Sequence, residues 1–474
     1  MHITTQVGHR TRLAVIALAV VTSVVAIYSV LDLNAFFAAA GLASMLIVVS
    51  PFLFIKTYDW FSMWTPVLIV VLYGGTVPAI CMSLKWPDAE YIEDSILMNR
   101  LPEYFVYPNI LLLMGLGFCT IGYFSRIRLP VPVFAIDRHY SLSRTYLVLG
   151  LLAIVSVSSL ALYIRFTAGA SGETVISGKR TVIQTLDVQN EKDFSQYGYL
   201  RQGALLSLTC FLVLTTVWTE RFIRLSYPRI VVLTLLFVVA SALPFYSSSR
   251  EQIAWNYLCA MGAFYYAGRP VFGGKSLGVL VGIVAIILFI SAVRNDRSDS
   301  APFSEKLITK LTPVLLNRHG PDIAKTAHII ENVPTPLGLK YGETIYVWLL
   351  APIPREILPS KPMMSPGPII GMEIYGNRFA GVPPGLIAEM YWNFHVVGVV
   401  LGSFFFGLFL RFVYEVCRAV RADDSLVTPV YLFALFPLGF QVLNNCLGGG
   451  VVMASVDMII SAVVVALCTV RTQR

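Results

Sequence analysis

Apolar residues occur along the chain in long runs that are separated by shorter polar stretches. A helix that crosses a bilayer needs roughly 17 to 25 mainly apolar residues, and twelve runs approach or reach that length. Several contain Gly or Pro, which membrane helices tolerate. The pattern predicts an all-α polytopic membrane protein with about twelve transmembrane helices. The runs lie near residues 12–30, 35–55, 60–82, 108–124, 145–166, 203–219, 229–246, 253–268, 276–293, 394–412, 428–446 and 451–470.

The charges in the connecting segments predict how these helices are oriented. Between the fourth and fifth runs, Arg126, Arg128, Arg138 and Arg144 face one acid, Asp137. Short loops rich in Arg and Lys stay on the cytoplasmic side of a membrane. We therefore expect both termini to be cytoplasmic, and we expect the first run to be a retained helix and not a cleaved signal peptide, because further runs follow it immediately.

Composition excludes a soluble protein. Of the 474 residues, 56% are hydrophobic and 13% are charged, and the mean hydropathy is +0.72. The net charge of +8 is explained by the basic loops, so we do not expect nucleic acid as a partner. Seven cysteines are present without a CxxC pair, which predicts neither a disulfide framework nor a metal site.

The runs divide the chain into three parts. Residues 1–293 hold nine predicted spans, residues 294–393 form a long outer loop, and residues 394–474 hold three more spans. Half of the 26 prolines fall in the loop, which predicts turns and stiff extended backbone. Short helices are expected after Ser304 and after Pro321, where His328 falls on an apolar face and is expected to pack.

Fixed cations outnumber candidate bases on the predicted outer face, which suits an anionic phosphate ligand better than a metal. Arginine stays charged and donates a planar fork of hydrogen bonds to phosphate. Four arginines are candidates for binding a diphosphate, and the simpler alternative is that they pair with neighbouring acids or lie at a helix end. They are Arg250, Arg294, Arg355 and Arg378.

Arg318 and His319 join a permanent cation to a side chain that is suited to proton transfer near neutral pH. They precede a helix that is expected to start at Pro321. We take them as candidate catalytic residues, and the alternative is a pair of solvated loop residues.

A second candidate constellation stands just before the tenth predicted span, where Glu389 is followed by Tyr391 and Asn393. An acid at that depth needs a partner. Glu389 can orient or deprotonate a sugar hydroxyl, and Tyr391 and Asn393 are candidates for sugar binding. Alternatively, Glu389 and Asn393 form a local hydrogen bond, because they share one helix face at positions i and i+4. His395 follows as a packed or water-facing histidine.

The segment Pro383-Pro-Gly-Leu-Ile-Ala-Glu-Met-Tyr-Trp-Asn-Phe-His395, followed by Gly398 and Gly407, resembles the Glu-x-Tyr-x-Asn-Phe-Gly region of O-antigen polymerases, the Wzy family. Pro354-Arg355 with Lys361-Pro362, and Ser247-Ser-Ser-Arg250, are similar to that family as well. The chain departs from the pattern at His395, where the family leads us to expect glycine.

The resemblance implies a GT-C-like membrane glycosyltransferase in the inner membrane of a bacterium, with no cofactor and no metal. Such an enzyme joins undecaprenyl-diphosphate-linked oligosaccharide repeats, which serve as donor and acceptor, and releases undecaprenyl diphosphate on the periplasmic face. Membrane lipid and a chain-length regulator would be its partners. Arginines 250, 318 and 355 would then neutralise the departing diphosphate.

Two other functions remain open from the sequence. An O-antigen ligase uses the same donor but transfers the glycan to lipid A-core. A lipid-linked oligosaccharide flippase or transporter also fits twelve spans, but few ionisable residues interrupt the span centres, where an alternating-access carrier needs them.

Overall fold

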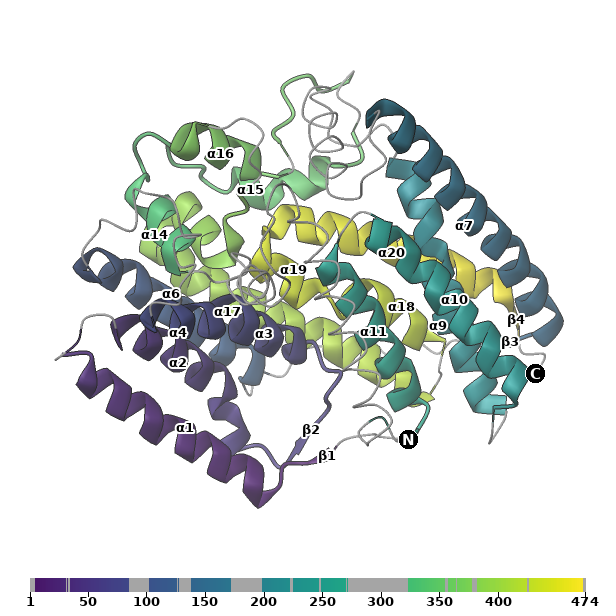
Figure 1. Cartoon of the computed structure of the whole chain (residues 1–474), viewed down its shortest axis with the longest axis horizontal. Coiled ribbons are helices and arrows are strands. Elements are labelled where there is room, and N and C mark those ends of the chain that lie inside the picture. Colours follow the sequence, from purple (N-terminus) through teal and green to yellow (C-terminus); the bar gives the residue numbers. More distant parts are fainter. Residues whose placement is uncertain are drawn as a thin grey trace, which may run out of the picture.

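The computed structural model is a bundle of apolar helices with two short strand pairs (Figure 1). Ten helices within the described part of the chain are long and apolar enough to cross a membrane. This confirms the membrane-embedded, helical class and ten of the expected spans. The structure describes residues 5–30, 32, 35–84, 102–125, 127, 138–171, 198–221, 225–246, 249–269, 271, 323–353, 357–363, 365–376, 382–423 and 426–471.

The helices before the long loop follow the first eight apolar runs. The eighth run forms α11, which has 17 residues, and the ninth expected span, 276–293, lies outside the described residues. Part of the third run is a π-helix, η2. The elements are α1 (His9–Tyr28), α2 (Ala35–Val49), η1 (Ser50–Leu53), α3 (Trp64–Val70), η2 (Val71–Thr76), α4 (Val77–Ser83), η4 (Pro102–Phe105), α6 (Val106–Phe124), α7 (Leu142–Ser171), α9 (Gly198–Arg221), α10 (Tyr227–Tyr246) and α11 (Arg250–Tyr266).

The described parts of the long loop form short elements, and the last three runs form long helical segments. The expected helix after Pro321 is confirmed as α14, whereas the helix expected after Ser304 lies outside the described residues. The elements are α14 (Ile323–Glu331), α15 (Glu343–Tyr346), η5 (Val347–Leu350), α16 (Gly367–Tyr375), α17 (Gly385–Asp423), α18 (Val427–Val430), the π-helix η6 (Tyr431–Leu435), α19 (Leu438–Asn444) and α20 (Leu447–Cys468).

Two antiparallel strand pairs join segments that are far apart in sequence. Strand β1 (Thr5–Gln6) pairs with β2 (Thr57–Tyr58), and β3 (Arg138–Tyr140) pairs with β4 (Thr469–Arg471). Two candidate spans separate β2 from β3, so both pairs lie on one side of the membrane if each span crosses once. We call this the strand side, and the opposite side, which carries η4, α14 to α16 and the starts of α17 and α20, the loop side.

The elements of the loop side gather on one edge of the molecule. Figure 1 shows α14, α15 and α16 together at the upper left, away from both strand pairs. The buried contacts of α14 explain this position: its Ala327 packs with Phe105 and Ala40, and His328 is buried and hydrogen-bonded to the Tyr375 hydroxyl at 3.1 Å. The expectation that His328 packs is confirmed.

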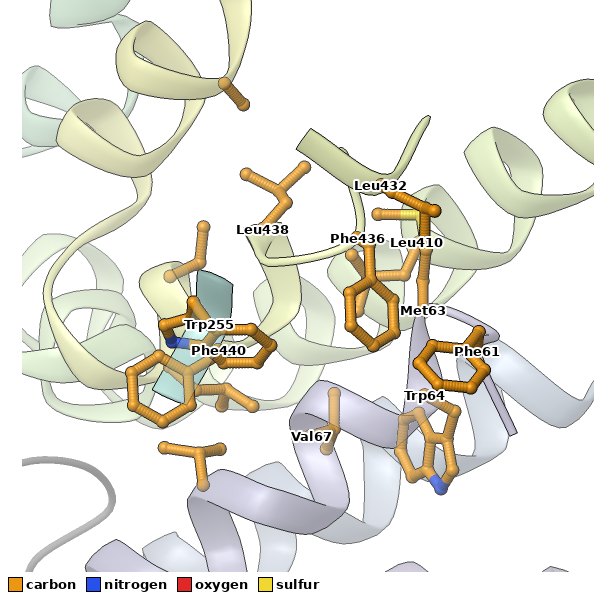
Figure 2. Close-up of a cluster of buried hydrophobic side chains, with 14 of the residues drawn as sticks. Phe61, Met63, Trp64, Val67, Trp255, Leu410, Leu432, Phe436, Leu438 and Phe440 are labelled. Atoms are coloured by element: carbon orange, nitrogen blue, oxygen red, sulfur yellow. The ribbon is translucent and has the colours of Figure 1, made fainter. Parts of the chain in front are cut away.

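The interior contains an aromatic cluster that joins α3, α11, α17 and α19. Figure 2 shows Trp64, Trp255, Phe436 and Phe440 among aliphatic side chains from α3, α17 and α19. The Trp255 ring lies 5.8 Å from the Phe436 ring and 4.9 Å from the Phe440 ring, both edge to face. The contact between Trp255 and Phe440 holds α11 against α19 in the interior.

A buried acid on the strand side accepts hydrogen bonds from three segments of the chain. The Asp59 carboxylate accepts hydrogen bonds from the Phe61 backbone N–H and from the hydroxyls of Tyr266 and Tyr414, each at 2.9 Å. Buried carboxylates are stable only when their oxygens are hydrogen-bonded. Asp59 therefore holds the loop after the second span against α11 and α17.

Candidate functional site

Three of the predicted site residues are described with their side chains, and all three lie at the start of α17. They are Glu389, Tyr391 and Asn393. Arg250 is the first residue of α11, and only its backbone is described. The other predicted site residues lie outside the described residues, and their roles stay predictions. They are Arg294, Arg318, His319, Arg355 and Arg378.

Helix α17 consists of two helical parts that meet at a kink. Phe394 has φ −143° and ψ 24°, and His395 has φ 53° and ψ −145°, so neither residue is helical. The short part, Gly385–Asn393, lies against the first turns of the long part, residues 396–423. A Cβ atom on Gly398 would lie 2.2 Å from the Met390 carbonyl oxygen, so glycine is required where the two parts touch.

Asn393 connects the short part of α17 to the segment before α15. Its Oδ1 accepts a hydrogen bond from the Gly342 N–H at 2.8 Å, and its Nδ2 donates to the Thr344 hydroxyl at 2.8 Å and to the Glu389 backbone carbonyl at 2.7 Å. The predicted local bond to Glu389 therefore forms, but it goes to the main chain and not to the carboxylate. With three bonds inside the protein, Asn393 positions the loop.

Trp392, the residue before Asn393, also attaches the segment before α15 to α17. Its indole N–H donates to the Gly338 carbonyl at 2.7 Å, and its own carbonyl accepts from the Lys340 N–H at 3.2 Å. The Lys340 ammonium lies 5.6 Å from the centre of the Trp392 ring, within the range of a cation–π contact. Residues 338–344 are thus held on α17 by several polar contacts, and no short sequence motif signals this pairing.

Glu389 caps the last helix. Its side chain is fully buried, and Oε2 accepts a hydrogen bond from the Leu447 N–H at 2.7 Å. Leu447 is the first residue of α20, where unpaired N–H groups and the helix dipole favour an anion. Its other oxygen, Oε1, has no hydrogen-bond partner within the described structure.

The turn between α19 and α20, Asn444–Leu447, brings the start of α11 and the start of α17 together. The Asn444 amide donates to the Glu251 carboxylate at 3.5 Å, and the Asn445 carbonyl accepts from the Gly385 N–H at 2.7 Å. The backbone of Arg250 is therefore placed beside the same turn that Glu389 caps. Two segments that are distant in sequence are joined here.

The thiol of Cys446 lies inside this turn. Burial and, to a smaller extent, the nearby Glu389 carboxylate raise the pKa of Cys446 to about 12, so the thiol is neutral at physiological pH. All seven cysteines of the chain are buried, and none of them forms a disulfide. Within the described ranges no group of three or more His, Cys, Asp or Glu residues is arranged to hold a metal ion.

A row of rings runs from α17 to the start of α6. The Tyr391 ring packs edge-on against the His395 ring at 5.1 Å and against the Tyr107 ring at 6.5 Å. Tyr391 is buried, His395 is half-buried and Tyr107 is 48% exposed. The row therefore extends from the interior to the surface at the loop side.

Sequence reasoning missed one acid. Asp457 lies near the middle of α20 and is one of the few ionisable residues in a span centre. Its Oδ1 is buried without a hydrogen-bond partner among the described residues, and the charge of Arg201 on α9 acts on it. The sequence alone shows this signal, because Asp457 stands inside the twelfth apolar run.

No protein-family model, no curated protein and no solved structure matches the chain. The interpretation of the site therefore rests on its own geometry and chemistry. What the described residues offer is a rigid, hydrogen-bonded wall on the loop side, with one buried carboxylate, one half-buried imidazole and a helix start that carries an arginine.

Proposed function

We propose that this protein is a membrane glycosyltransferase that joins polyprenyl-diphosphate-linked oligosaccharide units on the outer face of a bacterial inner membrane, as an O-antigen polymerase does. The observation that carries the proposal is the turn Asn444–Leu447, which holds the Glu389–Asn393 segment next to the start of α11 with Arg250. Both segments carry the resemblance, and a transferase site requires them to be close.

The strand pairs support the proposed orientation. They bring both described ends of the chain to loops on the strand side. Arg138 and Arg471 are register partners there, and short loops rich in arginine stay on the cytoplasmic side. Six candidate spans separate β3 from β4, so further crossings between them must be even in number. If α11 crosses, the apolar run 276–293 is the natural second crossing, which would give twelve spans and place the long loop outside.

The proposed reaction needs cations for the leaving diphosphate and an acceptor for one proton. Arg250, Arg318 and Arg355 would stabilise the negative charge that develops on the diphosphate. Arg294 and Arg378 would add to the same field. His319 remains a candidate for proton transfer. Tyr391 would contact sugar only through its exposed edge, because the side chain is 7% exposed.

Glu389 is better suited to positioning than to proton transfer in this scheme. A general base must reach the hydroxyl that it deprotonates, whereas the Glu389 carboxylate is 0% exposed and one oxygen is already bonded to Leu447. It would hold the starts of α17 and α20 in register, and so keep the wall of the site rigid.

The test is genetic. The gene is deleted in its host, and the strain is complemented with the original gene or with R250A, R318A, H319A, R355A or E389A. We expect the surface glycan ladder to collapse to core plus one repeat on deletion and to be restored by the original gene but not by the arginine variants. R418A is the matched control, because Arg418 lies near the strand-side end of α17, paired with Glu415 at 3.8 Å.

Other outcomes of this experiment have clear meanings. Loss of even the single repeat on the core would favour a ligase or a flippase, since without either protein no repeat reaches the core. An unchanged ladder would contradict a role in assembling that glycan. A variant that keeps the ladder but changes the distribution of glycan lengths would point to a chain-length regulator as a partner.

Asp457 favours a second candidate, a lipid-linked oligosaccharide flippase. Acids in the middle of a membrane helix often mark transport or proton pathways, and Asp457 is such an acid. For a polymerase we expect D457N to leave the ladder intact. For a flippase, D457N would stop the appearance of lipid-linked repeats on the outer face, which can be measured by their accessibility to a glycan-cleaving enzyme added to spheroplasts.

A further inference from the structure

The backbone of His395 has a conformation that favours glycine. Its φ of 53° and ψ of −145° combine a positive φ with an extended ψ, a region that L side chains rarely adopt because Cβ collides with the main chain. Tyr341 is the other non-glycine residue with positive φ in the described parts of the chain. A histidine at this position therefore costs stability that glycine would not cost.

Packing explains the kink but not the imidazole. The kink allows Met390 to lie against the long part of α17, where a Cβ on Gly402 would meet the Met390 sulfur at 2.3 Å. A glycine at position 395 would make the same turn without strain. The turn itself therefore does not require the side chain of His395.

The imidazole is the polar group of this segment that remains available. The Asn393 amide is used in three hydrogen bonds, and the Glu389 carboxylate is fully buried. His395 is half-buried and packs edge-on against Tyr391. Within the described structure neither ring nitrogen of His395 has a hydrogen-bond partner, so both are free to meet a ligand.

We propose that His395 is a catalytic residue: its imidazole accepts the proton of the attacking sugar hydroxyl, and Tyr391 and Tyr107 hold the ring and line the path to the surface. This inference rests on the proposed function. It adds a base that the described geometry makes accessible, on the same segment as Glu389. Presenting the imidazole at the kink requires the strained backbone. Strain of this kind is characteristic of functional sites.

The step balances as follows. The oxygen of the acceptor hydroxyl forms a bond to the anomeric carbon of the donor, and its proton moves to an imidazole nitrogen of His395. The bond between the anomeric carbon and the diphosphate oxygen breaks, and the electron pair leaves with the polyprenyl diphosphate. The imidazolium then releases its proton to water, which restores the neutral ring.

The experiment measures stability and activity on the same full-length variants, H395G and H395F. Stability is followed in nanodiscs with a thiol-reactive dye, because the seven buried cysteines react only on unfolding. Activity is followed in membranes of the deletion strain, which hold the lipid-linked repeats, as growth of the glycan ladder. Y341G controls the stability assay, since it relieves a positive φ at an exposed residue outside the ring row.

We expect H395G to unfold at a higher temperature than the original protein and to lose at least about 100-fold in polymerisation, the usual contribution of a general base. H395F keeps a ring against Tyr391 but accepts no proton, so it is expected to be equally inactive. Added imidazole should restore part of the activity of H395G and none of that of H395F, because only glycine leaves space for the free base. A structural role would not produce this rescue.

Three results would overturn the proposal. The strain argument is wrong if H395G unfolds at a lower temperature than the original protein. The catalytic role is wrong if H395G or H395F polymerises at the original rate, or if imidazole fails to rescue a well-folded H395G. An unchanged ladder in the deletion strain itself overturns the proposed function, and the catalytic role with it, and this result is distinct because it appears before any variant is tested.

Discussion

The two parts of α17 are held in place by different forces. Beyond the kink, the long part contacts α6 with almost no space between the main chains: a Cβ on Gly122 would lie 2.1 Å from the Phe404 carbonyl oxygen, and one on Gly407 would lie 2.0 Å from the Cys119 carbonyl oxygen. Before the kink, the short part is held by hydrogen bonds from Asn393 and Glu389. The contact of the long part with α6 requires glycines that have no side chain, whereas the contacts of the short part require polar side chains.

The membrane explains this difference. In hydrocarbon there is no hydrophobic gain when two helices associate, so close packing through small residues is the main attraction. At the boundary water competes, and a loop must be attached by specific, buried hydrogen bonds. The comparison predicts that the long part tolerates almost no change in shape, whereas the short part tolerates changes that keep its hydrogen bonds.

The largest effect is expected from G407A or G122A. The added methyl group would meet main-chain atoms, which cannot move without separating the helices, so we expect a loss of about 3 kcal/mol or more in unfolding free energy. The measurement is thermal unfolding with the thiol-reactive dye. G117A on α6 is the matched control, because a Cβ on Gly117 meets nothing within 4 Å; equal losses in G117A and G122A would contradict the packing argument.

N393A is expected to have the next largest effect. It leaves the buried Gly342 N–H without an acceptor and removes the bond to Thr344, which should cost about 2 kcal/mol. N332A is the control, since Asn332 donates one local bond, to the His328 carbonyl at 2.8 Å. The idea that Asn393 attaches the loop fails if both variants lose the same stability.

Two variants of Glu389 distinguish the effect of its hydrogen bond from the effect of its charge. E389A leaves the Leu447 N–H uncapped and should cost about 1.5 kcal/mol. E389Q keeps an oxygen for that bond and cannot ionise at this buried position, so we expect its stability to equal or exceed that of the original protein. If Glu389 positions the site, the E389Q strain keeps its ladder; a lost ladder with intact stability would instead make Glu389 a base.

The smallest effect is expected at the strand-side end of the long part, where hydrogen bonding replaces close packing again. Y414F removes one of the two hydroxyls that donate to the Asp59 carboxylate, and Tyr266 still donates, so a loss of about 1 kcal/mol is expected. A double variant, Y414F with Y266F, should lose more than the sum of the single changes. Additive losses would show that the two hydroxyls act independently.

The sequence was a reliable guide to the membrane helices and a poor guide to the kink. Long apolar runs predict helices because a spanning segment must satisfy its own backbone hydrogen bonds. The tenth span was expected to begin at residue 394, but α17 begins at Gly385 and is interrupted at Phe394 and His395. Neither residue is Gly or Pro, so no local signal marked the break.

The candidate site shows the same division. The spacing of Glu389 and Asn393 predicted a local bond, and a bond forms, but Asn393 also holds Gly342 and Thr344, which are distant in sequence. For Glu389 the sequence left two roles open, a carboxylate that faces a sugar hydroxyl and a local hydrogen bond that orients the helix end, and in the structure it caps α20 at Leu447. Asp457 was visible in the apolar run, and its burial beside α9 was not.

The amino-acid pattern was sufficient for the helical membrane class of the protein and for ten of its expected spans, because these follow from the local cost of placing residues in lipid or water. The partners of Glu389, the kink at His395 and the meeting of α11 with α17 depended on the tertiary structure. Such contacts arise when distant segments compete for the same buried space, and their geometry is set by close packing between helices.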